Sequence, residues 1–166
     1  MTTSSGVLWG ALAIGLVTGM RSTLAPAMVS HALADRNDLD AIGEPARTLA
    51  APRTRHLLAP LAAGELLGDK LPFAPDRTIA PSMAVRAVSG GLCAAALAGA
   101  RRQPMMLPAL LGATAACVSS VVMIRLRKRY RTGAISNAAL GLAEDGLAFA
   151  LGNAGLRRAL QVEPDG

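Results

Sequence analysis

Ionisable residues that could do chemistry interrupt otherwise apolar segments of the sequence. Glu144 and Asp145 lie near the middle of the segment 134–158, which we expect to form one helix. If that helix crosses a bilayer, a carboxylate at its centre costs about 2.5–3.5 kcal/mol, so it should face a partner or water rather than lipid. The alternative is that 134–158 consists of two short helices with a polar joint at these acids.

A second acidic pair, Glu65 and Asp69, is spaced so that both carboxylates lie on one face of a helix. Gly64 and Gly68 lie on a neighbouring face, where small residues allow a second helix to approach closely. Two stacked acids beside a close-packed face suit a cation or proton site. For Asp69 with the following Lys70 we prefer a plain helix end at the membrane interface, whereas for Glu65 we prefer the site.

Three arginines are the natural counter-charges for these acids. Arg86 lies about one turn inside its expected helix, whereas Arg21 and Arg101 lie at helix ends, where a long side chain can reach the interface. Arg86 is therefore the preferred partner in a buried ion pair. The hypothesised substrate or ion site has six residues: Arg21, Glu65, Asp69, Arg86, Glu144 and Asp145.

Signals for catalysis, a metal or a cofactor are weak. The Ser-Gly-Gly run at 89–91 has no histidine in the apolar segments to act as its base. No Gly-rich phosphate loop with its lysine and no paired-aspartate magnesium motif occurs. The separation of His31 and His56 is not that of a zinc motif, and Cys93 and Cys117 lie in apolar stretches, typical of packed thiols. We expect no catalytic residue, no metal and no cofactor, and an enzyme acting on lipid is the least favoured alternative.

The composition favours helices that lie in a membrane. Hydrophobic residues make up 52% and charged residues 17% of the 166 residues, against about 45–50% and about 25% in soluble domains. Aromatic residues are only 2%, and abundant Ala and Gly suit close helix packing in lipid. The net charge of +6 does not indicate a nucleic-acid partner, because its strongest cluster, 125–131, directly follows the longest apolar run, as at a cytoplasmic membrane border.

Six segments are predicted to be helices: 6–21, 23–34, about 50–70, 80–101, 104–127 and 134–158. Spanning a bilayer takes about 20 apolar residues, and the helix at 23–34 is short enough to be re-entrant. The polar stretch 35–55 predicts a loop, and no segment alternates with the period of a strand. We therefore expect an all-α fold, a polytopic transmembrane helical bundle of five to six short helices in one domain, residues 1–166.

An internal repeat at an offset of 80 residues is a further hypothesis. Glu65 matches Asp145 at this offset, and Arg21 matches Arg101. Three helices in each unit would invert the second unit relative to the first, as in transporters with a site near the midplane. The repeat predicts that Glu65 and Asp145 approach one another near the midplane, with Arg86 in reach of one of them. The two units would be 6–79 and 86–160.

Two runs of the sequence resemble motifs of a family of small bacterial membrane proteins known as a domain of unknown function. They are Gly-Met-Arg-Ser at 19–22 and Gly-Glu-Leu-Leu-Gly-Asp-Lys-Leu-Pro at 64–72, and the match spans roughly residues 10–160. The resemblance implies a multi-pass protein of the bacterial inner membrane, and it implies no reaction or substrate. If the motifs mark the family's site, the implied residues are Arg21, Glu65, Asp69, Lys70, Arg77 and Arg86.

The favoured function is a small transporter or channel-like protein for a cation, a proton or a small solute, using intramembrane carboxylates. The alternative is a non-enzymatic membrane scaffold or accessory subunit whose buried ion pairs serve structure alone. The expected partners are the lipid bilayer and a second copy of the chain, which would form a homodimer through Gly-rich helix faces. On the first helix, Gly6 with Gly10 and Gly15 with Gly19 form such faces, which suit packing within the bundle or in a dimer.

Overall fold

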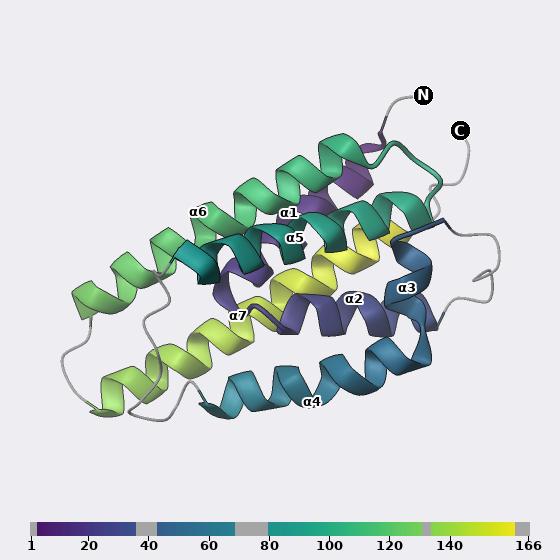
Figure 1. The fold of residues 1–166 in the computed structure, drawn as a ribbon. Helices are drawn as coiled ribbons and strands as arrows, with labels where there is room; N and C mark the ends of the chain where they lie inside the picture. Colours follow the sequence, from purple (N-terminus) through teal and green to yellow (C-terminus); the bar gives the residue numbers. More distant parts are fainter. Residues whose placement is uncertain (1–2, 36–42, 69–79, 131–133, 162–166) are drawn as a thin grey trace.

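The described part of the chain is entirely helical. The computed structural model describes residues 3–35, 43–68, 80–130 and 134–161, which form seven helices and no strand (Figure 1). The all-α prediction is confirmed, with each of the six expected helices present. The helices are α1 (Ser5–Met20), α2 (Leu24–Ala34), α3 (Ala46–Ala50), α4 (Pro52–Gly68), α5 (Ala80–Ala100), α6 (Met106–Tyr130) and α7 (Ala134–Leu160).

Two expectations about the helices need correction. The stretch 35–55 was expected to be a loop, but it contains α3, and the hydroxyl of Ser30 donates to the carbonyl oxygen of Leu49 in this short helix at 2.6 Å. The segment 134–158 is one continuous helix, α7, so the alternative of two short helices with a polar joint is wrong. Glu144 and Asp145 therefore lie inside a regular helix.

Only two of the described helices are long and apolar enough to cross a membrane, fewer than the five or six expected. They are the Ser82–Ala100 part of α5 and the Met106–Leu126 part of α6. Ser5–Met20 and Leu24–Ala34 are apolar but shorter. Length and composition thus indicate candidate spans in α5 and α6.

Helix α1 lies at the centre of the bundle and packs against α5, α6 and α7 (Figure 1). Small residues allow these close approaches, because a Cβ placed on Gly10 would lie 3.0 Å from the carbonyl oxygen of Gly155 in α7. A Cβ on Gly90 of α5 would lie 2.8 Å from the carbonyl oxygen of Gly112 in α6. The glycines of α1 are therefore already covered within one chain. A homodimer remains a prediction and would use another helix face. Gly64 of α4 is on such a face, because nothing lies within 4 Å of a Cβ added there.

Gly15→Ala should lower the free energy of unfolding by about 1–3 kcal/mol, because the added methyl group overpacks the contact between α1 and α6. Its Cβ would overlap the carbonyl oxygen of Gly112 and lie 2.7 Å from the Cβ of Ala115. Gly141→Ala in α7 is the matched control, because nothing lies within 4 Å of its added Cβ. That change should leave stability unchanged or raise it by up to about 1 kcal/mol. Thermal unfolding in detergent micelles measures both, and equal effects would contradict the packing.

The first two helices form a hairpin that turns beside the middle of the longer helices. A Cβ on Gly6 would lie 2.7 Å from the carbonyl oxygen of Arg158, near the end of α7, so α1 starts there. Gly19, near the end of α1, lies against Ser119, near the middle of α6. Helix α1 therefore ends about halfway along the bundle.

Helix α2 then runs back along α7 toward the end at which α1 starts. Leu24 lines the same groove as Phe149, and farther along α2 Met28 lies against Gly152. The contacts of α2 thus advance along α7 in the direction of its carboxyl end (Figure 1). This return has the topology that the re-entrant interpretation of the segment 23–34 predicts.

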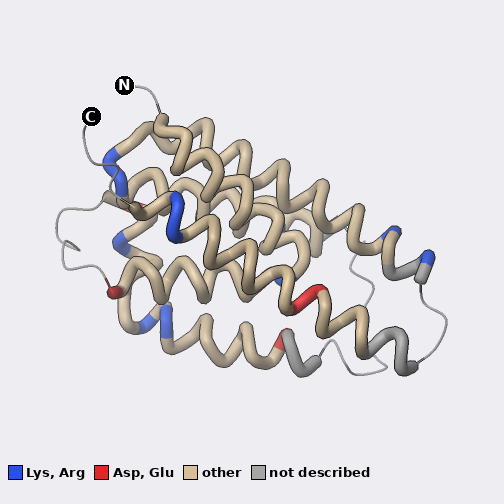
Figure 2. Tube along the Cα trace, turned by 180° about the vertical axis from the view of Figure 1, so that it is seen from behind, with Lys and Arg blue, Asp and Glu red and all other residues tan. Residues whose placement is uncertain are grey.

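Charged residues are unevenly distributed along the bundle. Figure 2 shows most Lys and Arg residues at its two ends, with long uncharged stretches of helix between them. An acidic stretch interrupts α7, where Glu144 and Asp145 lie. Among the arginines whose burial is described, two are buried, Arg21 with 1% and Arg86 with 4% of its surface exposed. Both buried arginines lie close to the turn between α1 and α2, because Arg21 directly follows α1 and Arg86 donates to the carbonyl oxygen of Gly19.

Candidate functional site

The end of α1 together with the turn that leads to α2 is called the hairpin tip here (residues 18–23). Polar side chains from four other helices bind to it. A helix that ends inside a bundle leaves its last carbonyl groups without partners in the helix. Arg86 of α5 supplies one set of partners, because its Nη1 donates to the carbonyl oxygens of Gly19 at 2.6 Å and Thr18 at 3.4 Å. A cation at this position also interacts favourably with the negative end of the α1 dipole.

Helix α6 satisfies further carbonyl groups near the end of α1. The Ser119 hydroxyl donates to the carbonyl oxygen of Leu16 at 2.9 Å, and the Ser120 hydroxyl donates to that of Gly19 at 3.1 Å. Both serines are buried. These serines were not identified from the sequence. Two adjacent serines within the longest apolar run were nevertheless a signal, because buried hydroxyl groups need hydrogen-bond partners.

Glu65 of α4 binds the start of α2. Its Oε1 accepts hydrogen bonds from the Ser22 amide at 2.8 Å and the Ser22 hydroxyl at 2.9 Å. Its Oε2 accepts from the Thr23 amide at 2.7 Å and the Thr23 hydroxyl at 2.6 Å. Both oxygens therefore bind the positive end of a helix, where negative charge is stabilised.

Asp145 of α7 forms an ion pair with Arg21 at the same turn. Its Oδ1 lies 2.5 Å from Nη2 and 2.8 Å from Nε of Arg21. The side chains are 1% exposed for Arg21 and 14% for Asp145. Arg21, which was expected to reach the membrane interface, therefore forms a buried ion pair. Arg21 does lie at a helix end, but that end is inside the bundle rather than at its surface.

Four of the six expected site residues meet at the hairpin tip. Asp145 binds Arg21, Glu65 binds the next residue, Ser22, and Arg86 binds the carbonyl groups just before them. The two acids thus reach consecutive residues of one turn. Glu144 is buried beside Asp145 on α7. The remaining expected residues, Asp69 with Lys70 and Arg77, lie outside the described residues.

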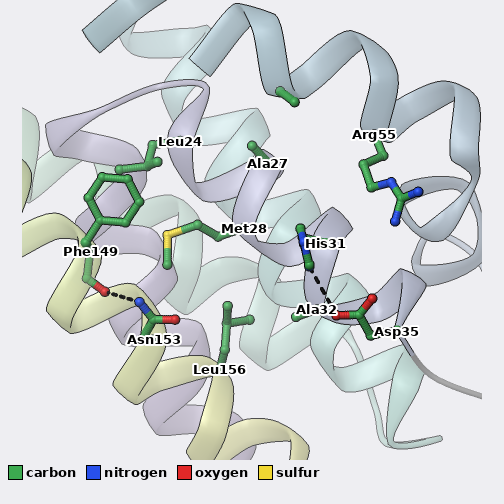
Figure 3. A pocket seen from close by; sticks show the side chains of 11 residues that line it. Leu24, Ala27, Met28, His31, Ala32, Asp35, Arg55, Phe149, Asn153 and Leu156 are labelled. Carbon is green, nitrogen blue, oxygen red and sulfur yellow. Dashed lines mark hydrogen bonds and ion pairs between the residues drawn. The ribbon is translucent and has the colours of Figure 1, made fainter. Parts of the chain in front are cut away.

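A groove of about 430 Å³ lies between α2, α4 and α7, and it begins next to the hairpin tip. Figure 3 shows Leu24 and Phe149 at one end of it, and His31 and Asp35 at the other. Leu24 directly follows Thr23, which binds Glu65. Within the described part of the chain, no group of three or more His, Cys, Asp or Glu residues could hold a metal ion.

The comparisons with known proteins identify one family. Residues 8–158 match the family model described as a domain of unknown function, DUF4126. No curated protein and no solved structure matches the chain. Because the match covers most of the sequence, including both helices of the hairpin and every element that contacts its tip, this chain belongs to the DUF4126 family of proteins.

Proposed function

We propose that the chain is a multi-pass protein of the bacterial inner membrane that carries a proton, a small cation or a small solute across it. The distribution of side chains supports the membrane location. Large apolar residues are exposed on the outer faces of α5 and α6, for example Val88 and Val118, each 60% exposed. Arg21 and Arg86 are buried instead. Apolar residues outside and charges inside are the arrangement expected in lipid.

The dimensions of the longer helices fit the same location. Helices α5, α6 and α7 have 21, 25 and 27 residues. At about 1.5 Å per residue, each is at least about 30 Å long, which matches the hydrocarbon core of a bilayer. Arginine and lysine residues gather at the two ends of the bundle, where headgroups and water would lie (Figure 2).

The observation that carries the transport proposal is the hairpin tip. Helix α1 ends beside the middle of α6, and the turn binds Glu65, Asp145 and Arg86. In many transporters, helices broken near the midplane form the substrate and ion sites, with charged groups at the exposed helix ends. A broken helix is tolerated at that depth only where protein or a water-filled cavity covers its free backbone groups.

Glu65 is the group that we propose carries the proton or contacts the cation. As a carboxylate it accepts four hydrogen bonds from Ser22 and Thr23. Protonation would turn one oxygen into a donor facing two N–H or O–H donors, and it would remove the charge that α2 stabilises. Binding of a proton or cation would therefore loosen the contact between α4 and the hairpin, which couples the ion to a movement.

Glu65→Gln should abolish ion flux while leaving a folded protein. The amide keeps the shape of the side chain but has no charge and only one accepting oxygen. Purified protein would be placed in liposomes with a pH-sensitive dye inside, and proton, sodium and potassium fluxes would be measured under a membrane potential. Glu44→Gln is the matched control, because the Glu44 carboxylate accepts similar bonds from the amide and hydroxyl of Thr48 at an exposed position.

The expected result is flux in the wild type and in Glu44→Gln, and only the background of empty liposomes in Glu65→Gln. Circular dichroism and elution as a single species in detergent check that the variants fold. A wild-type protein that is recovered folded in the membrane fraction but passes none of the three ions would contradict ion transport. Equal fluxes in both variants would contradict the role of Glu65.

The second candidate function is a scaffold or accessory subunit, and one observation favours it. Both oxygens of Glu65 are occupied by hydrogen bonds within the chain, and Asp145 is occupied by Arg21. Such saturated groups can hold a fold without binding any ligand. A fixed protein partner that copurifies with the wild type, together with the absence of flux, would favour this function.

A further inference from the structure

The groove between α2, α4 and α7 has one apolar end and one polar end. Next to the hairpin tip its walls are Leu24, Met28 and Phe149, and Leu156 lies farther along α7 (Figure 3). Asn153 lies on this wall too, but its Nδ2 donates to the carbonyl oxygen of Phe149 in its own helix, at 2.9 Å. The volume of about 430 Å³ falls within the range of about 300–1,000 Å³ typical of small-molecule sites.

At the other end the groove is lined by His31, Asp35 and Arg55. Figure 3 shows the Arg55 side chain extending from α4 on the side of the groove where His31 and Asp35 lie. His31 Nδ1 is 3.1 Å from Asp35 Oδ2, so these two side chains form an ion pair when His31 is protonated. Arg55 also lies in the first turn of α4, where the helix dipole favours anions.

The groove is covered on one side by a helix with few contacts elsewhere. Helix α4 packs mainly against α2 and α3, and among the side chains described in it only Ala62 is buried. At the inner end of the groove, Glu65 binds α4 to the tip through Thr23. A ligand in this groove would contact α4 at Arg55 and Ala59, and it would reach Leu24, which directly follows the Thr23 bound by Glu65.

We propose that this groove binds one phospholipid with an anionic headgroup, with the phosphate at Arg55 and an acyl chain along Leu24, Met28 and Phe149. The groove places an apolar trough beside the guanidinium of Arg55, which suits such a lipid, and a free phosphate would leave the apolar end unfilled. Arginine is well suited to phosphate because its planar group donates two parallel hydrogen bonds. The proposal rests on the membrane location proposed above, and it deepens the transport proposal because the lipid would touch both α4 and Leu24, the residue that directly follows the tip.

Native mass spectrometry of the full chain in detergent, titrated with phosphatidylglycerol or phosphatidylcholine of the same acyl chains, tests the site. The wild type should bind one phosphatidylglycerol about two- to fivefold more tightly than phosphatidylcholine, the scale of a partly exposed ion pair. Arg55→Gln should remove this preference. Arg53→Gln is the control, because Arg53 is exposed on the same helix but does not line the groove.

A second pair of variants tests the apolar end of the groove. Ala59 lines the groove from the exposed helix α4, so Ala59→Trp should fill it and weaken binding of both lipids without disturbing the core. Leu61→Trp, on another face of α4 and 56% exposed in the wild type, should leave binding unchanged. A wild type without headgroup preference, equal losses in the two arginine variants, or unchanged binding in Ala59→Trp would each overturn the proposal.

Ion flux measured on the same variants separates the two proposals. A wild type that conducts no ion contradicts transport, whatever lipid it binds. A headgroup preference that survives Arg55→Gln contradicts the lipid site, whatever the flux. If both proposals hold, Arg55→Gln should lose the preference for phosphatidylglycerol and should change the flux measured in liposomes of that lipid.

Discussion

Arg21→Met should lower the free energy of unfolding by about 3–5 kcal/mol, the scale measured when one partner of a buried ion pair is removed. The reason is that Asp145, 14% exposed, would keep its charge without the guanidinium that lies 2.5 Å away. Arg101→Met is the matched control, because Arg101 follows α5 as Arg21 follows α1 but is only partly buried. It should cost less than about 1 kcal/mol.

A double substitution separates the ion pair from the packing of the two side chains. Arg21→Met combined with Asp145→Leu removes both charges and keeps similar volume, so it should recover most of the stability lost in Arg21→Met. Thermal or denaturant unfolding in detergent compares the wild type, Arg21→Met, Asp145→Leu and the double variant. If the two single losses add in the double variant, Arg21 and Asp145 do not interact as the geometry requires.

The helices were predictable because their apolar segments are long and end at charges, glycines or prolines. Helix α3 was not, because five residues, Ala46–Ala50, are too few to show a helical period. Its position depends on tertiary contacts with α2, including the hydrogen bond from Ser30 to Leu49. Local sequence carries little information about an element that is held in place by its neighbours.

The acids of the site were predictable, but the pairing of each acid with its partner was not. Glu65 and Asp145 were recognised because a carboxylate in an apolar helix needs a partner. Arg21 was named among the counter-charges and site residues, but Arg86 was preferred to it on the assumption that a helix end lies at the membrane interface. Hydropathy does not distinguish a helix that crosses the bundle from one that turns halfway, and this difference decides where Arg21 lies.

The hairpin also gives polar residues of the tip partners that the local sequence does not indicate. Ser22 and Thr23 precede α2 and look like ordinary capping residues, yet their hydroxyls donate to Glu65, which is more than forty residues away in the chain. Ser119 and Ser120 bind carbonyl groups of α1 in the same way. Partners so distant in sequence become visible only in the fold.

Glu65→Ala should lower the free energy of unfolding by about 2–4 kcal/mol, because it leaves the amides and hydroxyls of Ser22 and Thr23 without the acceptor that binds them. Glu44→Ala provides the comparison, since it removes a carboxylate from two bonds to Thr48 at an exposed position. That loss should not exceed about 1 kcal/mol, the typical scale of a helix cap.

The comparison of Glu65→Ala with Glu65→Gln then discriminates between the two functions. In a scaffold the carboxylate serves only to hold α4 to the hairpin, so partner binding should follow stability across wild type, Gln and Ala. In a transporter the Gln variant should lose flux at temperatures where it is still fully folded, because the amide cannot exchange a proton or attract a cation. Unfolding curves and flux measured on the same preparations decide the matter. Flux that falls only in proportion to the unfolded fraction would contradict transport through Glu65.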